Sequence, residues 1–427
     1  MNRIDDIKLE STEGLEIIPI EIRNQGTKSI VQYILDLCKS PNSNPLYRTK
    51  LMVVGYENVG KTTILDCLFP ITDLGETKGT LMKTEYLIEL QGKCLRKYKP
   101  KELNNDYKIY KEIILENKQW KIQEIKETGL ELIPLNDKSQ KKIEVYFKNQ
   151  ETRDKWIERL KRVILNSATH GIEVNTHIWN FSKFNQQIAN GNENEEKDKD
   201  GQVEFSTWDF AGQNDYYNTH HYFLSNRSIF LVLYRMDQGI KGLESLDFWL
   251  KSLSSHLNQD HSDENGKPFY SIIIIGTFLD SIVDNQSDED KNLRETKIME
   301  IYDKNGLKSP PFYFEVSCST LENIDELREI IFNISLSHSY MGENVPIGYL
   351  TIEKSIYELR KLKQNHPIIE IQELMTYIQS QYQSQSFEFD IEFVKRGLRL
   401  LHEWGICIYF DEPIELSNIV VLDPQYL

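Results

Sequence analysis

Short and almost uninterrupted apolar runs recur along the chain, each ending where a glycine or a polar loop begins. The first covers residues 50–54 and is followed by Gly55, and similar runs cover residues 205–208, 228–234, 271–276 and 311–317. Helical patterns separate most of these runs, beginning with residues 61–68. Apolar strands that alternate with helices predict an α/β fold with a doubly wound, mostly parallel sheet.

Residues 79–166 have a different pattern, in which polar and apolar positions alternate as in half-buried strands. Residues 142–147 are one example, and a helix predicted over residues 151–165 closes the segment with Trp156 on its apolar face. The segment has a net charge of +6, whereas the whole chain has −16. We therefore expect a basic β domain inserted into an acidic α/β domain.

The two ends of the chain add further elements. A helix is predicted over residues 26–38, and the chain becomes mainly helical after residue 336, with a strand pair at residues 406–410 and 419–422. The predicted domains are a lead-in, the α/β domain in two pieces, the insertion and a C-terminal domain: residues 1–45, 46–78 with 167–338, 79–166, and 339–427.

Composition narrows the class of protein. The 427 residues are 39% hydrophobic and 27% charged, which is typical of a soluble chain of more than one domain. The net charge of −16 argues against a nucleic-acid binder. No apolar run reaches the roughly 18 residues of a membrane span, and no signal peptide is visible. The five cysteines lie far apart, as expected for reduced thiols of a cytoplasmic protein.

A phosphate-binding loop follows the first apolar run. Its pattern G-x-x-x-x-G-K-[ST] begins at Gly55 and ends at Lys61 and Thr62, between a predicted strand and a predicted helix. Backbone N–H groups would surround the phosphates, Lys61 would supply a positive charge, and the Thr62 hydroxyl would bind Mg²⁺. The candidate binding residues here are Gly55, Tyr56, Glu57, Asn58, Val59, Gly60, Lys61, Thr62 and Thr63.

A second motif, Asp209-Phe-Ala-Gly212-Gln213, follows the strand that ends at Trp208. Asp209 is expected to hold Mg²⁺ through water, and the Gly212 N–H to sense the terminal phosphate. Gln213 is the candidate catalytic residue that orients the attacking water.

A carboxylate at Asp280 predicts which base is bound. It follows the isoleucine-rich strand in Thr277-Phe-Leu-Asp280, where it can accept two hydrogen bonds from guanine, whereas adenine lacks that donor pair. The backbone of Ser317 and Cys318 would support the guanine oxygen. Thr277 and Phe278 replace the Asn and Lys of the usual motif. The predicted ligands are therefore GTP or GDP with Mg²⁺, and Asp280 argues against the alternative of an ATPase.

Together these motifs resemble the Roc GTPase domain of the Roco family, which includes the leucine-rich repeat kinases. Residues 208–224 resemble the Roc switch II segment, and residues 277–280 resemble its guanine motif Thr-His-x-Asp. Residues 167–173 resemble switch I. This resemblance makes Thr169 a candidate catalytic residue and Mg²⁺ ligand, beside Thr62 and Asp209.

Other segments resemble neighbouring domains of that family. Residues 346–427 resemble the start of the COR domain, a helical and winged-helix-like unit that implies a possible homodimer, and residues 15–22 resemble the connection from a leucine-rich repeat array. The insertion resembles a pleckstrin-homology (PH) domain, with residues 79–83 as its first strand. Two interpretations of its basic residues stay open, solvated charges on strands and loops, or a contact with membrane phosphoinositide that would give a peripheral-membrane location: Lys93, Arg96, Lys97, Lys99 and Lys101.

The expected function is a GTP-binding molecular switch that hydrolyses GTP slowly, as a regulatory module of a larger signalling protein. Glu57 stands where many Ras-like GTPases have a glycine beside the terminal phosphate, and no arginine finger is evident. The alternative is a scaffold or dimerisation module that binds nucleotide without hydrolysing it. We also expect that removing residues 79–165 would leave nucleotide binding intact.

Overall fold

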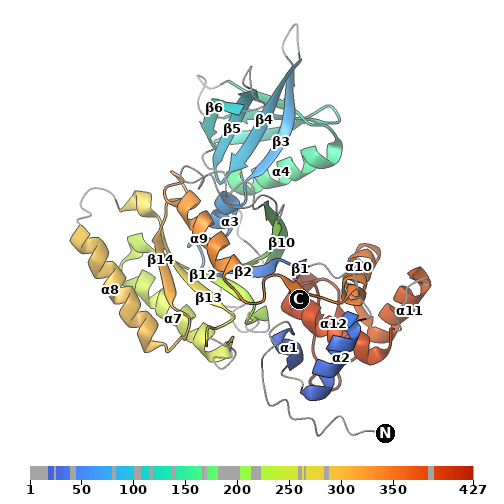
Figure 1. Cartoon of the computed structure of the whole chain (residues 1–427). Helices are drawn as coiled ribbons and strands as arrows, with labels where there is room; N and C mark the ends of the chain where they lie inside the picture. The colour runs from blue at the N-terminus through green and yellow to red at the C-terminus, as the bar shows by residue number, and fades with distance from the viewer. Residues whose placement is uncertain are drawn as a thin grey trace, which may run out of the picture.

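The computed structural model describes most of the chain, in ranges separated by short gaps. It describes residues 18–23, 26–38, 45–78, 83–100, 107–115, 119–135, 141–165, 169, 171–180, 202–212, 223–257, 262–263, 266–282, 288–382 and 389–426. These residues form a central α/β unit, an antiparallel β unit above it in Figure 1, and a helical C-terminal unit beside it.

The central sheet has six described strands in the order β10-β11-β2-β12-β13-β14, as the α/β pattern predicts. All neighbours are parallel except β10 and β11. The strands are β10 (Ile172–Asn180), β11 (Gln202–Phe210), β2 (Arg48–Val54), β12 (Ser228–Arg235), β13 (Ser271–Thr277) and β14 (Pro311–Glu315).

Helices cover both faces of this sheet, which explains why its central strands are apolar at nearly every position. Leu51 and Val53 pack with α3 (Lys61–Leu68) and α9 (Ile324–Leu336). Met52 and Val54 point the other way, into the layer formed with α7 (Ile240–His256) and α8 (Asp288–Lys304). Because successive side chains of a strand alternate between faces, one short run supplies both cores.

The antiparallel unit is a seven-stranded sheet that packs against α4 (Gln150–Leu165). Trp156 of α4 is fully buried in its core and donates a hydrogen bond to Asp73. In sheet order the strands are β6 (Tyr107–Ile114), β5 (Cys94–Pro100), β4 (Lys83–Gln91), β3 (Ile71–Lys78), β9 (Ile143–Tyr146), β8 (Gly129–Pro134) and β7 (Trp120–Ile125).

This sheet begins earlier than the predicted boundary at residue 79. Strand β3 starts at Ile71, only two residues after α3, and pairs with β4 along its whole length. Its residues Asp73, Gly75 and Glu76 are poor strand formers, so the local sequence gave no strand signal, and pairing with β4 decides the conformation. The predicted first strand at residues 79–83 falls outside the described residues except for Lys83, where β4 begins.

The C-terminal unit contains helices and a small antiparallel sheet. Strand β18 (Ile419–Val421) pairs with β17 (Ile408–Tyr409), as the sequence predicts for these two segments, and also with β16 (Ile368–Glu370). The helices are α10 (Ile347–Leu362), α11 (Ile371–Gln381) and α12 (Ile391–Glu403).

The N-terminal segment packs into this same unit, which the predicted division at residue 45 did not foresee. Helices α1 (Ile20–Arg23) and α2 (Thr27–Cys38) share its core through side chains such as Ile22 and Tyr33. Buried Asp36 of α2 pairs with Arg396 of α12 at 2.9 Å, and β1 (Pro45–Leu46) pairs with β15 (Glu343–Asn344). The resemblance of this segment to the end of a repeat array stays a prediction.

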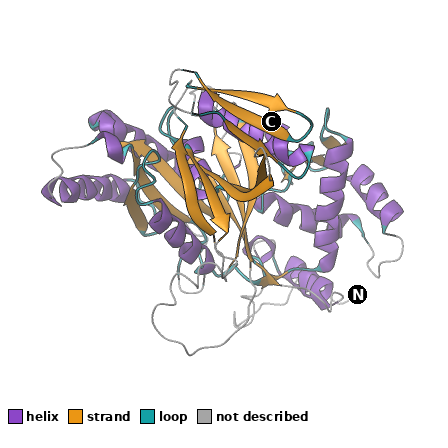
Figure 2. Cartoon of the chain, turned by 90° about the horizontal axis from the view of Figure 1, so that it is seen from above, coloured by secondary structure: helices purple, strands orange, loops and turns teal. Residues whose placement is uncertain are grey.

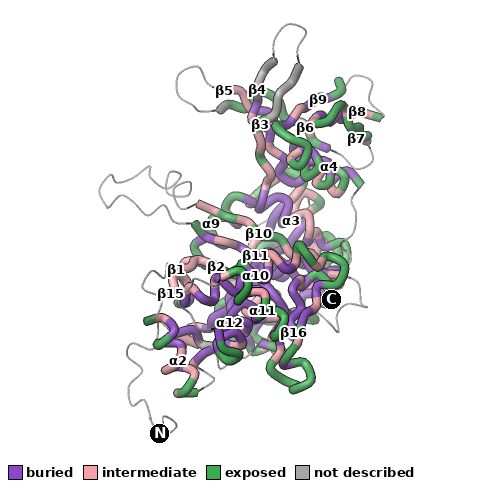
Figure 3. The backbone as a smooth tube through the Cα atoms, turned by 90° about the vertical axis from the view of Figure 1, so that its right-hand side faces the viewer, coloured by how far each residue is buried: buried purple, intermediate pink, exposed green. Residues whose placement is uncertain are grey.

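The arrangement of the units is visible from two further directions. In Figure 2 the strands occupy the middle of the molecule and the helices of the central and C-terminal units lie on its two sides. In Figure 3 the antiparallel unit lies at one end of the molecule. Many residues of the central sheet and of α12 are buried. None of the described helices is both long and apolar enough to cross a bilayer.

Candidate functional site

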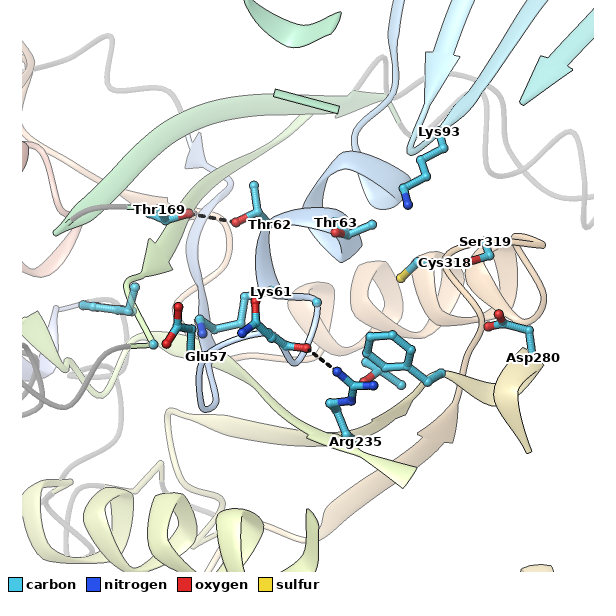
Figure 4. Close-up of a pocket in the computed structure, with 16 residues that line it drawn as sticks. Glu57, Lys61, Thr62, Thr63, Lys93, Thr169, Arg235, Asp280, Cys318 and Ser319 are labelled. Atoms are coloured by element: carbon cyan, nitrogen blue, oxygen red, sulfur yellow. Dashed lines mark hydrogen bonds between the residues drawn. The ribbon is translucent and has the colours of Figure 1, made fainter. Parts of the chain in front are cut away.

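A cavity of about 400 Å³ lies where the parallel strands β2, β11, β12 and β13 end, which is where α/β sheets bind ligands. Figure 4 shows the side chains that surround it. Its lining includes these predicted residues: Glu57, Asn58, Gly60, Lys61, Thr62, Thr63, Thr169, Gly212, Thr277, Asp280 and Cys318. The predicted residues that do not line it are Gly55, Tyr56, Val59, Asp209 and Ser317.

The phosphate loop leads from β2 directly into α3, which begins at Lys61 as predicted. Lys61 is 7% exposed, and its ammonium donates to the carbonyl oxygens of Gly55 at 2.9 Å and Tyr56 at 2.8 Å. Burial lowers the pKa of Lys61 to about 8, opposed by the nearby charge of Asp209. An ammonium removed from water at the mouth of a helix N-terminus is well suited to bind phosphate.

Three oxygen-bearing side chains from separate elements converge beside the loop. The Thr62 hydroxyl lies 2.8 Å from that of Thr169 and 2.5 Å from Asp209 Oδ2, and Thr169 donates to the same carboxylate oxygen at 2.8 Å. These are the three residues that the sequence assigned to Mg²⁺. Thr169 follows α4 closely in the chain, so the antiparallel unit ends next to this cluster.

The donor set fits a magnesium ion. Asp209 is 2% exposed, and its Oδ1 is buried without a hydrogen-bond partner. Burial raises the pKa of this carboxyl, and hydrogen bonds from Thr62 and Thr169 oppose the rise. A hard cation with hydroxyl, carboxylate and phosphate oxygens around it would satisfy the orphaned oxygen.

Gly212 packs directly on the phosphate loop. A Cβ at this position would collide with the backbone nitrogen of Glu57 and would lie 2.5 Å from Lys61 Nζ. Only glycine therefore allows the segment after β11 to approach the loop this closely. Gln213, the predicted catalytic residue, lies outside the described residues, so its role stays a prediction.

Asp280 stands at the far end of the cavity from Lys61 (Figure 4). Ser317, which is completely buried, donates to Asp280 Oδ1 at 2.6 Å and accepts from the backbone N–H groups of Ser319 and Thr320. The Ser317 side chain thus orients the carboxylate and does not line the cavity. Cys318 and Ser319 do line it.

Thr277, a predicted nucleotide-binding residue, lines the cavity and contacts the backbone of two other segments. It is 2% exposed, and its hydroxyl lies 2.9 Å from the Val59 carbonyl and 3.1 Å from that of Tyr234. The side chain joins the segment that carries Asp280 to the loop between β2 and α3, so it holds these two segments in register.

Sequence reasoning did not identify five residues that line the cavity: Lys93, Phe210, Arg235, Phe278 and Ser319. The Arg235 guanidinium lies 3.8 Å from the centre of the Phe278 ring and donates to the Asn58 carbonyl at 3.4 Å. Arg235 ends strand β12, so a position at the edge of the sheet was a usable signal. No feature of the sequence predicts that Lys93 lines the cavity, because Lys93 belongs to the antiparallel unit and not to the central sheet.

The strand that carries Asp209 also contacts the C-terminal unit. Trp208 is 1% exposed, and Lys50 lies over its ring at 5.1 Å and donates to the His402 carbonyl at 3.3 Å. A Cβ on Gly405, which follows α12 and has φ +77°, would lie 2.6 Å from the Trp208 ring. The C-terminal unit is thus in van der Waals contact with the residue that precedes Asp209.

Two arginines of α4 fix the antiparallel unit to the central unit. Arg159 and Arg162 pair with Asp66 of α3 at 2.6 and 3.1 Å, and Arg162 also pairs with Glu173 of β10. Burial raises the pKa of Asp66 to about 6, although both arginines act to lower it. The pairs are largely withdrawn from water, so removing either partner would leave a buried charge.

The basic residues predicted to contact lipid do not form one free surface. Arg96 pairs with Glu89 and Glu112, and Lys97 is 7% exposed, with a pKa lowered by burial to about 8. Lys99 lies over the Tyr110 ring at 3.9 Å, and Lys101 is outside the described residues. Contact with phosphoinositide stays a prediction of the sequence.

Part of this chain matches a protein-family model. Residues 160–263 match the model of the family described as "Ras of Complex, Roc, domain of DAPkinase". The match includes Thr169, Asp209 and Gly212 but begins after the phosphate loop, because the antiparallel unit separates that loop from the rest of the central unit.

Several relatives of this chain are named as protein kinases. A probable serine/threonine-protein kinase of Dictyostelium discoideum, pats1, is 26% identical over all of this chain, and roco5 of the same organism is 26% identical over 96% of it. Leucine-rich repeat serine/threonine-protein kinase 1 of Caenorhabditis elegans is 26% identical over 57%. The chain spans only 10%, 12% and 10% of these relatives.

A similar solved structure is that of Methanosarcina barkeri Roco2 RocCORdC bound to GDP, which aligns with 90% of this chain. The alignment covers 75% of the residues of that structure's chain, with 16% sequence identity and a TM-score of 0.47.

Proposed function

We propose that this chain, which carries a Roc domain of the Roco family, binds GTP and GDP with Mg²⁺ and acts as a slowly hydrolysing molecular switch. One observation carries the proposal. Thr62, Thr169 and Asp209 converge beside the buried ammonium of Lys61, and Asp280 stands at the other end of the same cavity. A phosphate chain and a guanine base fit these two ends.

The switch would operate through the two segments that bring Thr169 and Asp209 to the phosphate loop. When bound, Mg²⁺ neutralises phosphate charge and shares its coordination with the terminal phosphate. Thr169 and Gly212 are placed to respond to that phosphate, which only GTP has. Because Trp208 precedes Asp209 and touches Gly405, a shift of this segment would reach the C-terminal unit, which resembles COR.

The kinase names of the relatives favour a regulatory role within a longer signalling protein. The chain covers about a tenth of those relatives, so a downstream Ser/Thr kinase is part of the proposal. Homodimerisation through the COR-like residues 339–427 and a cytoplasmic or peripheral-membrane location likewise stay predictions. The competing function is a scaffold that binds nucleotide without hydrolysis, and a single-turnover measurement separates the two.

Guanine selectivity is the first test. We expect the chain to bind GDP and GTP and to reject ADP and ATP in an equilibrium titration. In the Asp280→Ala variant the two base donors lose their acceptor, so GDP affinity should fall about 100-fold while ADP affinity changes little. Ser281→Ala is the matched control, because Ser281 is exposed, directly follows Asp280 and does not line the cavity. Equal affinity of the wild-type chain for ADP would refute the guanine assignment.

Hydrolysis is the second test. The wild-type chain should convert bound GTP to GDP slowly in a single turnover, because Glu57 stands where many Ras-like GTPases have a glycine beside the terminal phosphate and the sequence identifies no arginine finger. Gln213→Leu should lower the rate about tenfold and leave GTP affinity unchanged, since positioning of water contributes only to the transition state. An unchanged rate would remove Gln213 from the mechanism, and no turnover in the wild type would favour the scaffold.

A further inference from the structure

The turn between β4 and β5 joins the antiparallel unit to the nucleotide cavity. The Gly92 N–H donates to the Asp66 carbonyl at 3.1 Å, and Gln91 Nε2 donates to the Cys67 carbonyl at 3.0 Å. Both acceptors belong to the last turns of α3, the helix that begins at the phosphate loop. The turn is therefore held against the wall of the cavity.

Gly92 allows an unusually close approach at this place. It has φ +53°, and a Cβ would lie 2.6 Å from Cys67 Sγ and 3.6 Å from the Cys318 carbonyl. Cys318 belongs to the loop at the base end of the cavity. The turn thus contacts both α3 and the loop that contains Cys318. The ion pairs of α4 with Asp66 are a second attachment of the antiparallel unit to α3.

Lys93, the next residue, lines the cavity from this turn. Figure 4 shows its side chain pointing down from the antiparallel strands toward Thr63 and Cys318, across α3 from Lys61. It is half-buried, and within the described part of the chain its ammonium has no carboxylate or hydrogen-bond acceptor. A cation held in a cavity without a partner is placed to bind an anion.

We propose that Lys93 is a ligand of the nucleotide, its ammonium binding the α-phosphate, so that the antiparallel unit completes the nucleotide site. The inference rests on the proposed guanine-nucleotide function. A nucleotide bound there extends from Lys61 at its terminal phosphate to Asp280 at its base, and Lys93 lies over Thr63 between these ends. The α-phosphate is common to GDP and GTP, so the contact serves both.

This role gives the insertion a function that surface attachment alone does not. A lysine ammonium is a compact charge with three donors and no fixed plane, which suits a phosphate approached from one side. The sequence predicts that removing residues 79–165 leaves nucleotide binding intact. If Lys93 is a ligand, the same deletion removes it, and we expect nucleotide binding to become weaker instead.

The experiment compares Lys93→Met with Lys121→Met in the full chain, by titration with GDP and with GTP. Lys121 is an exposed lysine on β7 of the same unit, so it controls for loss of one positive charge. Lys93→Met should weaken GDP and GTP equally, by about tenfold, as expected for a partly solvated charged hydrogen bond. Lys121→Met should leave both affinities unchanged, and Lys93→Arg should restore most of the loss.

The outcomes separate this inference from the proposed function. Unchanged affinities in Lys93→Met, with normal GDP binding by the wild type, would overturn the role of Lys93 and leave the proposed function standing. A loss confined to GTP would also overturn it, because it would place the ammonium at the terminal phosphate. A wild-type chain that binds no GDP would overturn both. Equal melting temperatures of wild type and Lys93→Met exclude misfolding as the cause of a loss.

Discussion

Lys61→Ala is expected to lower the affinity for GDP and GTP by about 100- to 1,000-fold. The buried ammonium supplies charged hydrogen bonds to phosphate, each contributing about 1.5–3 kcal/mol, and alanine replaces none of them. The loss should exceed that of Asp280→Ala, because phosphate carries more charge than the base. Isothermal titration with GDP measures it directly.

The structure also offers a control for this experiment. Lys251→Ala removes an exposed lysine on α7 of the same unit and should change GDP affinity less than twofold. The melting temperature of Lys61→Ala without nucleotide should not fall, because burial of the ammonium opposes its charged state. GDP affinity of Lys61→Ala equal to that of wild type would rule out the phosphate loop as the binding site.

Gly405→Ala is expected to lower the free energy of unfolding by about 2–5 kcal/mol. The positive φ of +77° costs a side chain about 1–2 kcal/mol, and the collision with Trp208 and Lys50 adds about 1–3 kcal/mol. Denaturant unfolding followed by tryptophan fluorescence measures the change. Because Trp208 precedes Asp209, GDP release should also become faster.

Gly306→Ala is the matched variant for this test. Gly306 has φ +67°, but no atom lies within 4 Å of the Cβ that alanine would add. It should therefore lose only the backbone contribution of about 1–2 kcal/mol and keep the wild-type rate of GDP release. Similar effects of the two variants on stability and release would contradict the proposed coupling between the C-terminal unit and the segment after β11.

The sequence by itself determined the central fold and the two ends of the candidate site. Apolar runs buried on both faces specify the parallel strands, and the loop from Gly55 to Thr62 lies between β2 and α3 as its pattern requires. Asp209 and Asp280 were found for the same reason, because Asp209 lies at the end of β11 and Asp280 lies shortly after β13. The carboxyl ends of parallel strands meet at one edge, so local patterns placed distant residues together.

Only the tertiary structure decided which units share a core or a site. Poor strand formers in β3 adopt a strand because β4 pairs with them, and α2 joins the C-terminal core through contacts more than 300 positions away, such as Asp36 with Arg396. Thr277 binds backbone carbonyls, and Lys93 enters the cavity from another unit. Hydrophobic and charged contacts depend on which residues are close in space. A local sequence pattern therefore predicts that a surface is buried, but not which distant part of the chain buries it.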